Sequence, residues 1–149
     1  MQIVILTILV WAPAAQGATG KVFKVLPQFL NEKGRAALSP SLFERDAYQA
    51  HLRMNREKRN GIRFAVQWKT HKAVWAPLKL RVELRGTAEG NLPKEKTIEK
   101  QVDAGKYFRK WTNLDLTGQP YADFGEVTAW RVTLWEGEDL LAEQKSFLW

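Results

Sequence analysis

Cysteine is absent from the 149 residues, and histidine occurs only as His51 and His71. The lack of cysteine excludes disulfide scaffolds, thiolate zinc sites and cysteine nucleophiles. The two histidines lie in differently patterned segments, so the sequence predicts no histidine-based metal site. Ten glycines and six prolines are too few for a collagenous or low-complexity chain, and an apolar content of 45% is enough for one packed domain.

Charge is absent from the first 20 residues. There an apolar block at residues 3–12 precedes Pro13 and a run of small residues. This order is typical of a signal peptide, with Ala15 and Gly17 in the −3 and −1 pockets of the peptidase. We therefore predict a signal peptide over residues 1–18, a single domain over residues 19–149, and export to the periplasm or the extracellular space. The alternatives are a membrane anchor through residues 3–12 and a buried element of the fold.

Known catalytic and cofactor motifs are also missing. The sequence has no G-x-S-x-G elbow, no glycine-rich phosphate loop and no D-x-D-x-D calcium loop. Acidic residues are plentiful, but none lies in the apolar setting that the acid of a glycosidase needs. RNP-like, zinc-finger and helix-turn-helix patterns are missing as well, which together with the signal peptide disfavours nucleic acid as a partner. The sequence therefore predicts no enzyme, no metal and no cofactor.

One amphipathic helix is predicted over residues 41–59. Ser41 and Glu44 have the spacing of a capping box. One side of this helix carries an apolar stripe of Phe43, Ala47, Ala50 and Met54. The other side is basic, with Arg45, Arg56 and Arg59, and with Arg53 at its flank. We expect the apolar stripe to pack on the outer face of a sheet. The basic side is either a solvated face or a contact for an anionic partner such as membrane headgroups, acidic polysaccharide or nucleic acid.

Outside this helix the apolar residues alternate with polar ones. This period of two predicts seven strands, at residues 21–26, 62–69, 78–85, 97–103, 106–116, 127–135 and 140–148. Pro27 is expected to stop the first strand or to mark it as an edge strand. Seven short strands with one buried face each are typical of an all-β antiparallel sandwich.

Residues 123–129 read D-F-G-E-V-T-A and precede a long predicted strand. The spacing of Asp123 and Gly125 resembles the corner between strands E and F of immunoglobulin-like domains, which reads D-x-G-x-Y-x-C. Val127 and Ala129 stand in place of the family's Tyr and Cys, so the disulfide-bearing antibody type is excluded. The resemblance implies an immunoglobulin- or fibronectin-like sandwich in which the predicted helix is inserted after the first strand. It implies no particular chemistry.

The charge of the chain is unevenly distributed. Residues 21–111 hold 21 Lys and Arg against nine Asp and Glu, whereas residues 112–149 hold two against seven. Such asymmetry predicts a basic binding face. It vanishes in three dimensions if the acidic strands lie beside the basic ones.

A second candidate surface lies on the strand before Leu114 and Leu116. Counting back by two from these residues places Tyr107, Arg109 and Trp111 on the outward side. Outward aromatic residues can stack on sugar rings while an arginine binds an acidic group. Trp75, in a loop, is a further candidate. The alternative is that this row packs under the helix.

These patterns predict a non-enzymatic binding or interaction module of the cell envelope or extracellular space, with a protein or a glycan as its partner. A carbohydrate-binding module that uses the outward aromatic row is one alternative. A polyanion-binding protein that uses the basic side of the helix is the other.

Overall fold

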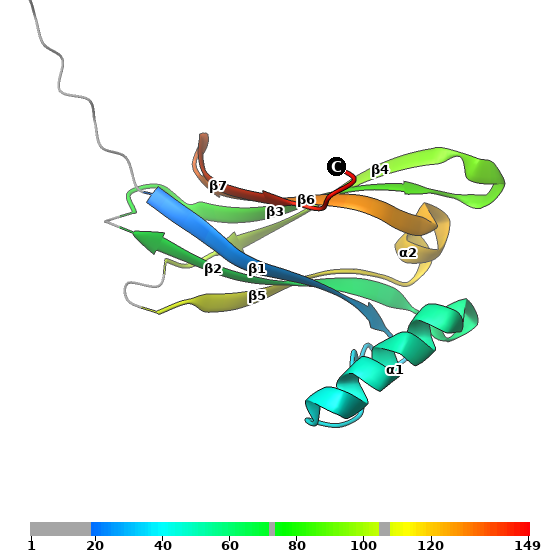
Figure 1. Ribbon diagram of the computed structural model, residues 1–149. Helices are drawn as coiled ribbons and strands as arrows, with labels where there is room; N and C mark the ends of the chain where they lie inside the picture. Colours follow the sequence, from blue (N-terminus) through cyan, green and yellow to red (C-terminus); the bar gives the residue numbers. More distant parts are fainter. Residues whose placement is uncertain (1–18, 72–73, 105–107) are drawn as a thin grey trace, which may run out of the picture.

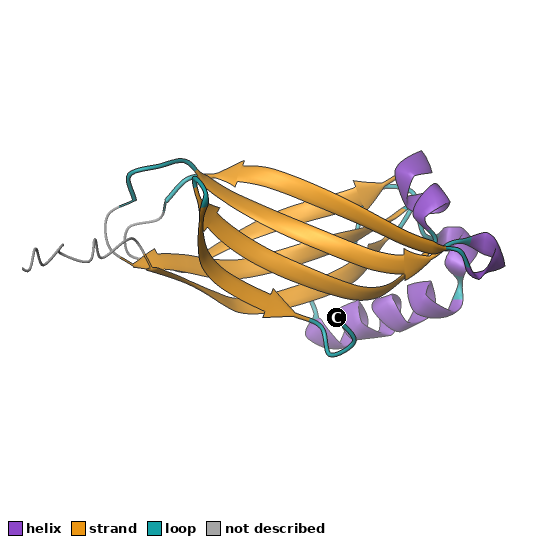
Figure 2. Cartoon of the chain, turned by 90° about the horizontal axis from the view of Figure 1, so that it is seen from above, coloured by secondary structure: helices purple, strands orange, loops and turns teal. Residues whose placement is uncertain are grey.

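The computed structural model describes residues 19–71, 74–104 and 108–149. Two antiparallel sheets lie face to face, one above the other in Figure 1, and Figure 2 shows them from above. The three-stranded sheet has the order β1-β2-β5, with β1 (Thr19–Leu30), β2 (Gly61–His71) and β5 (Lys110–Thr117). The four-stranded sheet has the order β4-β3-β6-β7, with β4 (Pro93–Val102), β3 (Leu78–Thr87), β6 (Glu126–Glu136) and β7 (Asp139–Lys145).

The architecture confirms the predicted all-β sandwich of seven antiparallel strands with one main helix after the first strand. That helix is α1 (Leu42–Met54), and the 3-10 turn Arg56–Lys58 follows it. A shorter helix, α2 (Gln119–Phe124), and the 3-10 turn Glu89–Asn91 complete the fold. In the part of the chain that the structure describes, no helix has the length and apolar character needed to cross a bilayer.

Alternation along the strands builds the core between the sheets. Phe64, Val66 and Trp68 of β2 face inward and are fully buried. From the other sheet, alternate residues of β3 and β6 meet them, and these are Leu80, Val82, Leu84, Val132 and Leu134. Each such side chain stabilises the fold by about 1.5–3 kcal/mol through its removal from water. The core fixes the register, because a shift of one residue would turn these side chains outward.

Strand β1 is longer than the prediction. It continues through Pro27 to Leu30, because β1 is an edge strand that pairs only with β2 and can spare a backbone N–H there. Its pairing shifts between Val22 and Lys24, which leaves Phe23 at a β-bulge. At the other end of the chain β7 is also an edge strand, and it ends at Lys145 rather than at residue 148.

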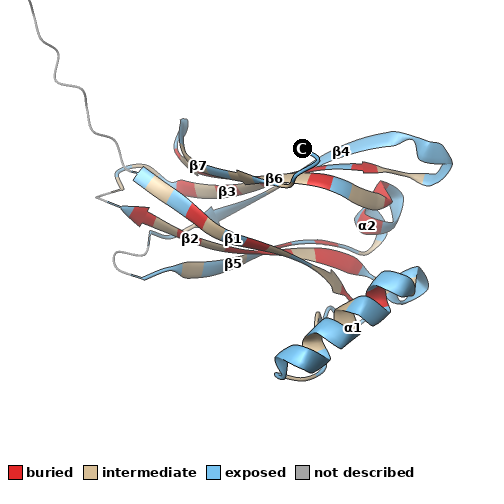
Figure 3. Cartoon of the chain, in the orientation of Figure 1, coloured by how far each residue is buried: buried red, intermediate tan, exposed pale blue. Residues whose placement is uncertain are grey.

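Helix α1 does not pack as the sequence predicts. It lies at one end of the sandwich, beside the last residues of β1, and most of its surface is exposed (Figures 1 and 3). The predicted apolar stripe faces away from the protein: Phe43 is 82% exposed and Met54 85%. The opposite side is the one that packs, with Leu52 buried among its neighbours. The expectation that the stripe would cover a sheet was therefore wrong.

Hydrogen bonding explains this orientation of α1. The Gln49 side chain accepts from the Phe29 N–H (2.8 Å) and donates to the carbonyls of Phe29 (2.9 Å) and Ala36 (2.7 Å). These bonds satisfy backbone groups at the open edge of β1, which would otherwise be costly to bury. The expected capping box is also absent, because the Ser41 side chain makes no capping hydrogen bond.

Candidate functional site

Basic and aromatic residues gather on the outer side of the three-stranded sheet, around the start of β1 and the start of β5. Figure 1 shows that this end of the sandwich is remote from α1. Register places Lys24, Gln67 and Trp111 side by side across β1, β2 and β5. One row further along, Lys21 lies opposite Lys69. We call this surface the basic-aromatic face and define it as Lys21, Phe23, Lys24, Gln67, Lys69, Arg109 and Trp111.

Two of its side chains are linked through Phe23. The Arg109 guanidinium lies 4.0 Å from the centre of the Phe23 ring, and the Lys21 ammonium lies 5.2 Å from it. Both distances are within the range of a cation–π interaction. The bulge in β1 places Phe23 where it meets these cations. Trp111, which is half exposed, adds a second aromatic ring that is open to solvent.

The cations of this face are not neutralised. Among the described residues, no carboxylate lies within 4.0 Å of Lys21, Lys24, Lys69 or Arg109. The only ion pair on the described outer side of this sheet joins Arg63 to Asp115 at the other end (2.7 Å), and the hydrogen bond to Asp115 raises the pKa of Arg63. Like charges directly opposite one another, as Lys21 and Lys69 are, destabilise a sheet. The basic-aromatic face is therefore arranged at some cost to stability.

The structure brings together only part of the predicted aromatic row. Arg109 and Trp111 lie on the basic-aromatic face, whereas Tyr107 lies outside the described residues. Trp75 is 90% exposed, but it belongs to the connection between β2 and β3 rather than to the face. Helix α1 does not cover the row, so the alternative in which it packs under the helix was wrong.

Sequence reasoning missed the contribution of β1. Its first residues read as a short strand, and the alternation alone assigns Lys21 and Phe23 to one side and Lys24 to the other. The bulge after Val22 changes this assignment and sets Lys24 opposite the outward Gln67. A run of two lysines around a phenylalanine was the available signal, but a bulge has no reliable sequence signature.

Two arginines from the basic side of the predicted helix, Arg56 and Arg59, make contacts within the protein. The Arg59 side chain is only 5% exposed and donates to Glu126 (3.0 Å) and to the carbonyls of Leu52 (2.5 Å) and Arg53. It also stacks on the Phe29 ring at 4.1 Å. Arg56 shares the Glu126 carboxylate (3.3 Å). Arg45 is half-buried and Arg53 is exposed, so these four arginines do not form one free cationic surface.

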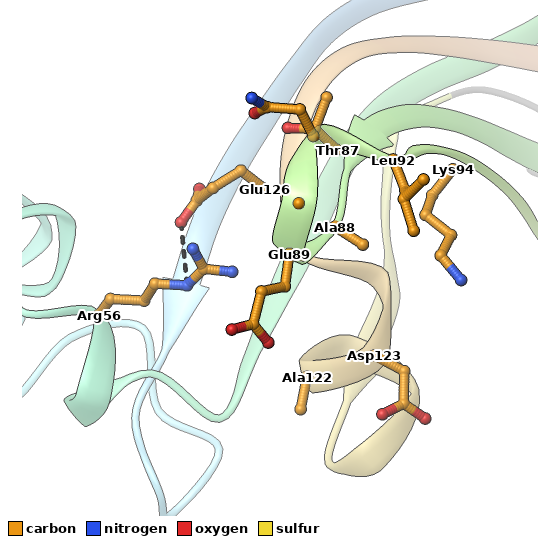
Figure 4. A pocket seen from close by; sticks show the side chains of 12 residues that line it. Arg56, Thr87, Ala88, Glu89, Leu92, Lys94, Ala122, Asp123 and Glu126 are labelled. Carbon is orange, nitrogen blue, oxygen red and sulfur yellow. Dashed lines mark ion pairs between the residues drawn. The ribbon is translucent and has the colours of Figure 1, made fainter.

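A hollow of about 710 Å³ lies elsewhere, between the β3–β4 hairpin, α2 and Arg56 (Figure 4). Its lining mixes both signs of charge. The Glu126 carboxylate is held by arginines, and the side chains of Glu89 and Asp123 do not point toward one another in Figure 4. Over the described ranges, no group of three or more acidic or histidine side chains is placed to hold a metal ion. The hollow thus shows no converging catalytic carboxylates.

Comparison with known proteins adds no functional information, since no family model, no curated protein and no solved structure matches the chain.

Proposed function

We propose that this protein is a non-enzymatic, exported binding module whose basic-aromatic face binds an acidic polysaccharide. The observation that carries the proposal is the gathering of four cations without carboxylate partners and two aromatic rings on one outer sheet face, among the residues described. The cell envelope and the extracellular space are the sites where such a polymer would be met. Export itself rests on the predicted signal peptide at residues 1–18, which lie outside the described part of the chain.

The chemistry of the face fits an acidic sugar chain. Carboxylate or sulfate groups form charge-assisted hydrogen bonds with lysine and arginine. The apolar face of a sugar ring packs on an aromatic side chain such as Trp111. The face is an extended open surface rather than an enclosed cavity, so it suits a linear polymer better than a small enclosed ligand. Gln67, between Lys24 and Trp111, supplies an amide that can donate to and accept from hydroxyl groups.

We further propose that the sandwich is of the immunoglobulin or fibronectin type. In immunoglobulin domains strand B pairs with E, and C pairs with F. The pairs β2–β5 and β3–β6 have the same places in chain order here, which supports the proposal. Gly125 follows α2 with φ 88°, and a Cβ there would collide with the backbone of Thr87. This relation concerns the fold and carries no function by itself.

Binding is tested with polygalacturonate, dextran sulfate and neutral dextran in titration calorimetry at several salt concentrations. We expect both polyanions to bind and neutral dextran not to bind, with affinity falling as salt rises. Lys24→Gln/Lys69→Gln should weaken polygalacturonate binding about tenfold or more. Lys33→Gln/Lys145→Gln removes the same charge outside the face and serves as the matched control.

Trp111→Ala separates sugar recognition from mere charge attraction. It keeps every cation and should cost about fivefold in affinity for polygalacturonate, with little change for a duplex DNA of similar charge. Equal losses for the two charge variants would overturn the proposed site. Tighter binding of DNA than of both polysaccharides would overturn the proposed ligand class.

Export has its own test. The intact mass of the protein, recovered from separated soluble, membrane and extracellular fractions of its host, should be short by the predicted signal peptide and should be found outside the cytoplasm. A full-length mass in the cytoplasm would refute this part of the proposal.

A further inference from the structure

A basic groove lies where the two sheets stand open, between the edge strands β4 and β5. It measures about 400 Å³, and Lys100, Lys110, Trp111 and Thr112 belong to its lining. Register shows that both lysines stand on the core-facing side of their strands. Lys100 is opposite the buried Leu80, and Lys110 is opposite the buried Trp68. Their ammonium groups reach the open edge and define what we call the lysine groove.

Among the described residues, each ammonium group of the lysine groove has one hydrogen-bond acceptor. Lys110 Nζ donates to the carbonyl of Asp103 (2.7 Å), and Lys100 Nζ donates to that of Asn113 (3.3 Å). Each ammonium has three N–H groups, so each retains capacity for another acceptor. Asp103 is the acidic residue of the described lining, and its carboxylate lies beyond 4.0 Å of both ammonium groups. Two cations, neither in an ion pair with a described carboxylate, therefore share one concave site.

Thr112 supplies a neutral donor at the same place. Its hydroxyl oxygen accepts a hydrogen bond from Trp68 Nε1 at 2.9 Å. Because that bond uses a lone pair, the hydroxyl proton remains free to be donated. Trp111, the next residue, lines the groove and also belongs to the basic-aromatic face. Register places Trp111 on the outer side of β5, so the groove and the face meet around this edge strand.

We propose that the lysine groove binds one oxyanion, a carboxylate or a sulfate, carried by a sugar whose ring packs against Trp111. The two ammonium groups and the Thr112 hydroxyl donate to the oxygens of the anion, and charge-assisted bonds of this kind are the strong ones. The inference rests on the proposed function and deepens it, because it gives the acidic substituent of the polymer a defined subsite. The basic-aromatic face, which begins at β5, then holds the adjoining part of the polymer.

Lysines at these positions also have a purely protective use. Inward-pointing charges on an edge strand prevent its pairing with another sheet, and Lys94 and Lys96 occupy inward positions of β4 as well. Protection requires only charge at the edge. Binding requires the particular donors of the groove, so the two roles respond differently to substitution.

The test is a titration followed by ¹H–¹⁵N NMR on the whole chain, with the Trp68 indole N–H and the Thr112 amide as reporters. Galacturonate monosaccharide carries one carboxylate, galactose is its neutral match, and sodium sulfate is an anion without a ring. We expect the chemical shifts of both reporters to change and to saturate with galacturonate. Sulfate should change them as well, but with lower affinity, and galactose should leave them unchanged. Lys100→Gln/Lys110→Gln should weaken galacturonate binding about tenfold or more.

The face variant Lys24→Gln/Lys69→Gln is the matched control, because it removes the same charge and leaves the groove intact. It should keep the galacturonate shifts while losing affinity for polygalacturonate. If the groove double variant aggregates, Lys110→Gln alone retains Lys94, Lys96 and Lys100 at the edge and should still lose most of the binding.

Reporter shifts that persist unchanged in the groove variants would overturn the subsite. Equal binding of sulfate and galacturonate would overturn the packing of a sugar ring on Trp111. Polygalacturonate binding that survives the face variant would instead count against the proposed function, so the two failures are distinguishable.

Discussion

The outer faces of the two sheets differ in whether their charged side chains are paired. On the four-stranded sheet, basic and acidic side chains alternate across neighbouring strands and pair. Arg81 reaches Glu99 of β4 at 2.7 Å, and Arg131 of β6 binds Glu83 through two hydrogen bonds of 2.7 and 2.9 Å. On the three-stranded sheet, the cations of the basic-aromatic face have no carboxylate partner among the described residues. The excess positive charge that gives the chain a net charge of +7 is thus unevenly distributed over the surface.

This difference decides between two readings of the uneven charge along the chain. Acidic residues of the C-terminal part do pair with basic residues from earlier in the chain, since Asp115 of β5 binds Arg63 of β2, and Glu126 of β6 binds Arg56 and Arg59. Among the described residues, compensation between the two parts of the chain is therefore real, but it is confined to the end of the sandwich near α1. The excess positive charge remains where β1, β2 and the start of β5 meet.

The largest effect is expected where a charge joins the two sheets. Arg59 connects Phe29 of β1 to Glu126 of β6 and is almost fully buried. Arg59→Met should lower the free energy of unfolding by about 3 kcal/mol, because the carbonyls of Leu52 and Arg53 lose this donor, the stacking on Phe29 is lost and Glu126 keeps only Arg56. Urea denaturation measures this loss. Arg53→Met, at an exposed position nearby, is the control. An equally small loss of stability in both variants would contradict the role of Arg59 in joining the two sheets.

Charge reversal on the basic-aromatic face should separate binding from stability. Lys24→Glu/Lys69→Glu should reduce polygalacturonate affinity about a hundredfold and leave the urea midpoint nearly unchanged. Lys33→Glu/Lys145→Glu makes the same change in net charge outside the face. Similar affinities for the two reversed proteins would remove the functional distinction between the two sheets.

Acid should lower the stability that the ion pairs of the four-stranded sheet contribute. The hydrogen bond from Arg131, above all, lowers the pKa of Glu83 in the folded protein. A depressed pKa gives stability that is present above the unfolded pKa of about 4.3 and is lost as the pH falls through the folded value. Glu83→Gln should cost about 1 kcal/mol or less at pH 7 and should flatten the fall in stability below about pH 4.5. Urea unfolding at a series of pH values checks this, and an unaltered pH profile would contradict it.

The smallest effect has the opposite sign. Lys69→Thr removes the like charge opposite Lys21 and places a good strand former on β2. It should raise the free energy of unfolding by a few tenths of a kcal/mol while weakening polygalacturonate binding. Loss of stability in this variant would show that the cations of the face are not a cost to the fold.

The strands could be predicted from the sequence because their evidence is local. Phe64, Val66 and Trp68 alternate with polar residues, and the same rule placed Arg109 and Trp111 outward. The helix was predicted at the right place but with the wrong packed side. Its orientation depends on Gln49 meeting the backbone of Phe29, a contact between residues 20 positions apart that hydrophobic periodicity does not encode.

The candidate site was predicted only in part for a related reason. The partnership of Arg109 with Phe23 depends on a bulge in β1 and on the order of three strands, and neither is visible in a single sequence. The lysine groove likewise requires that β4 and β5 be edge strands of their sheets and that both lie on the same side of the sandwich. Sequence patterns identify the faces of strands, whereas topology decides which faces meet.

The Gln49 side chain has a consequence for self-association. Its amide accepts from and donates to the same residue, Phe29, and so imitates one rung of a β-ladder. The end of β1 that would otherwise recruit an incoming strand is already occupied by this imitation. Addition of another strand, the first step toward fibrils, is thereby hindered at this end of β1 by a helix that contributes little to the core.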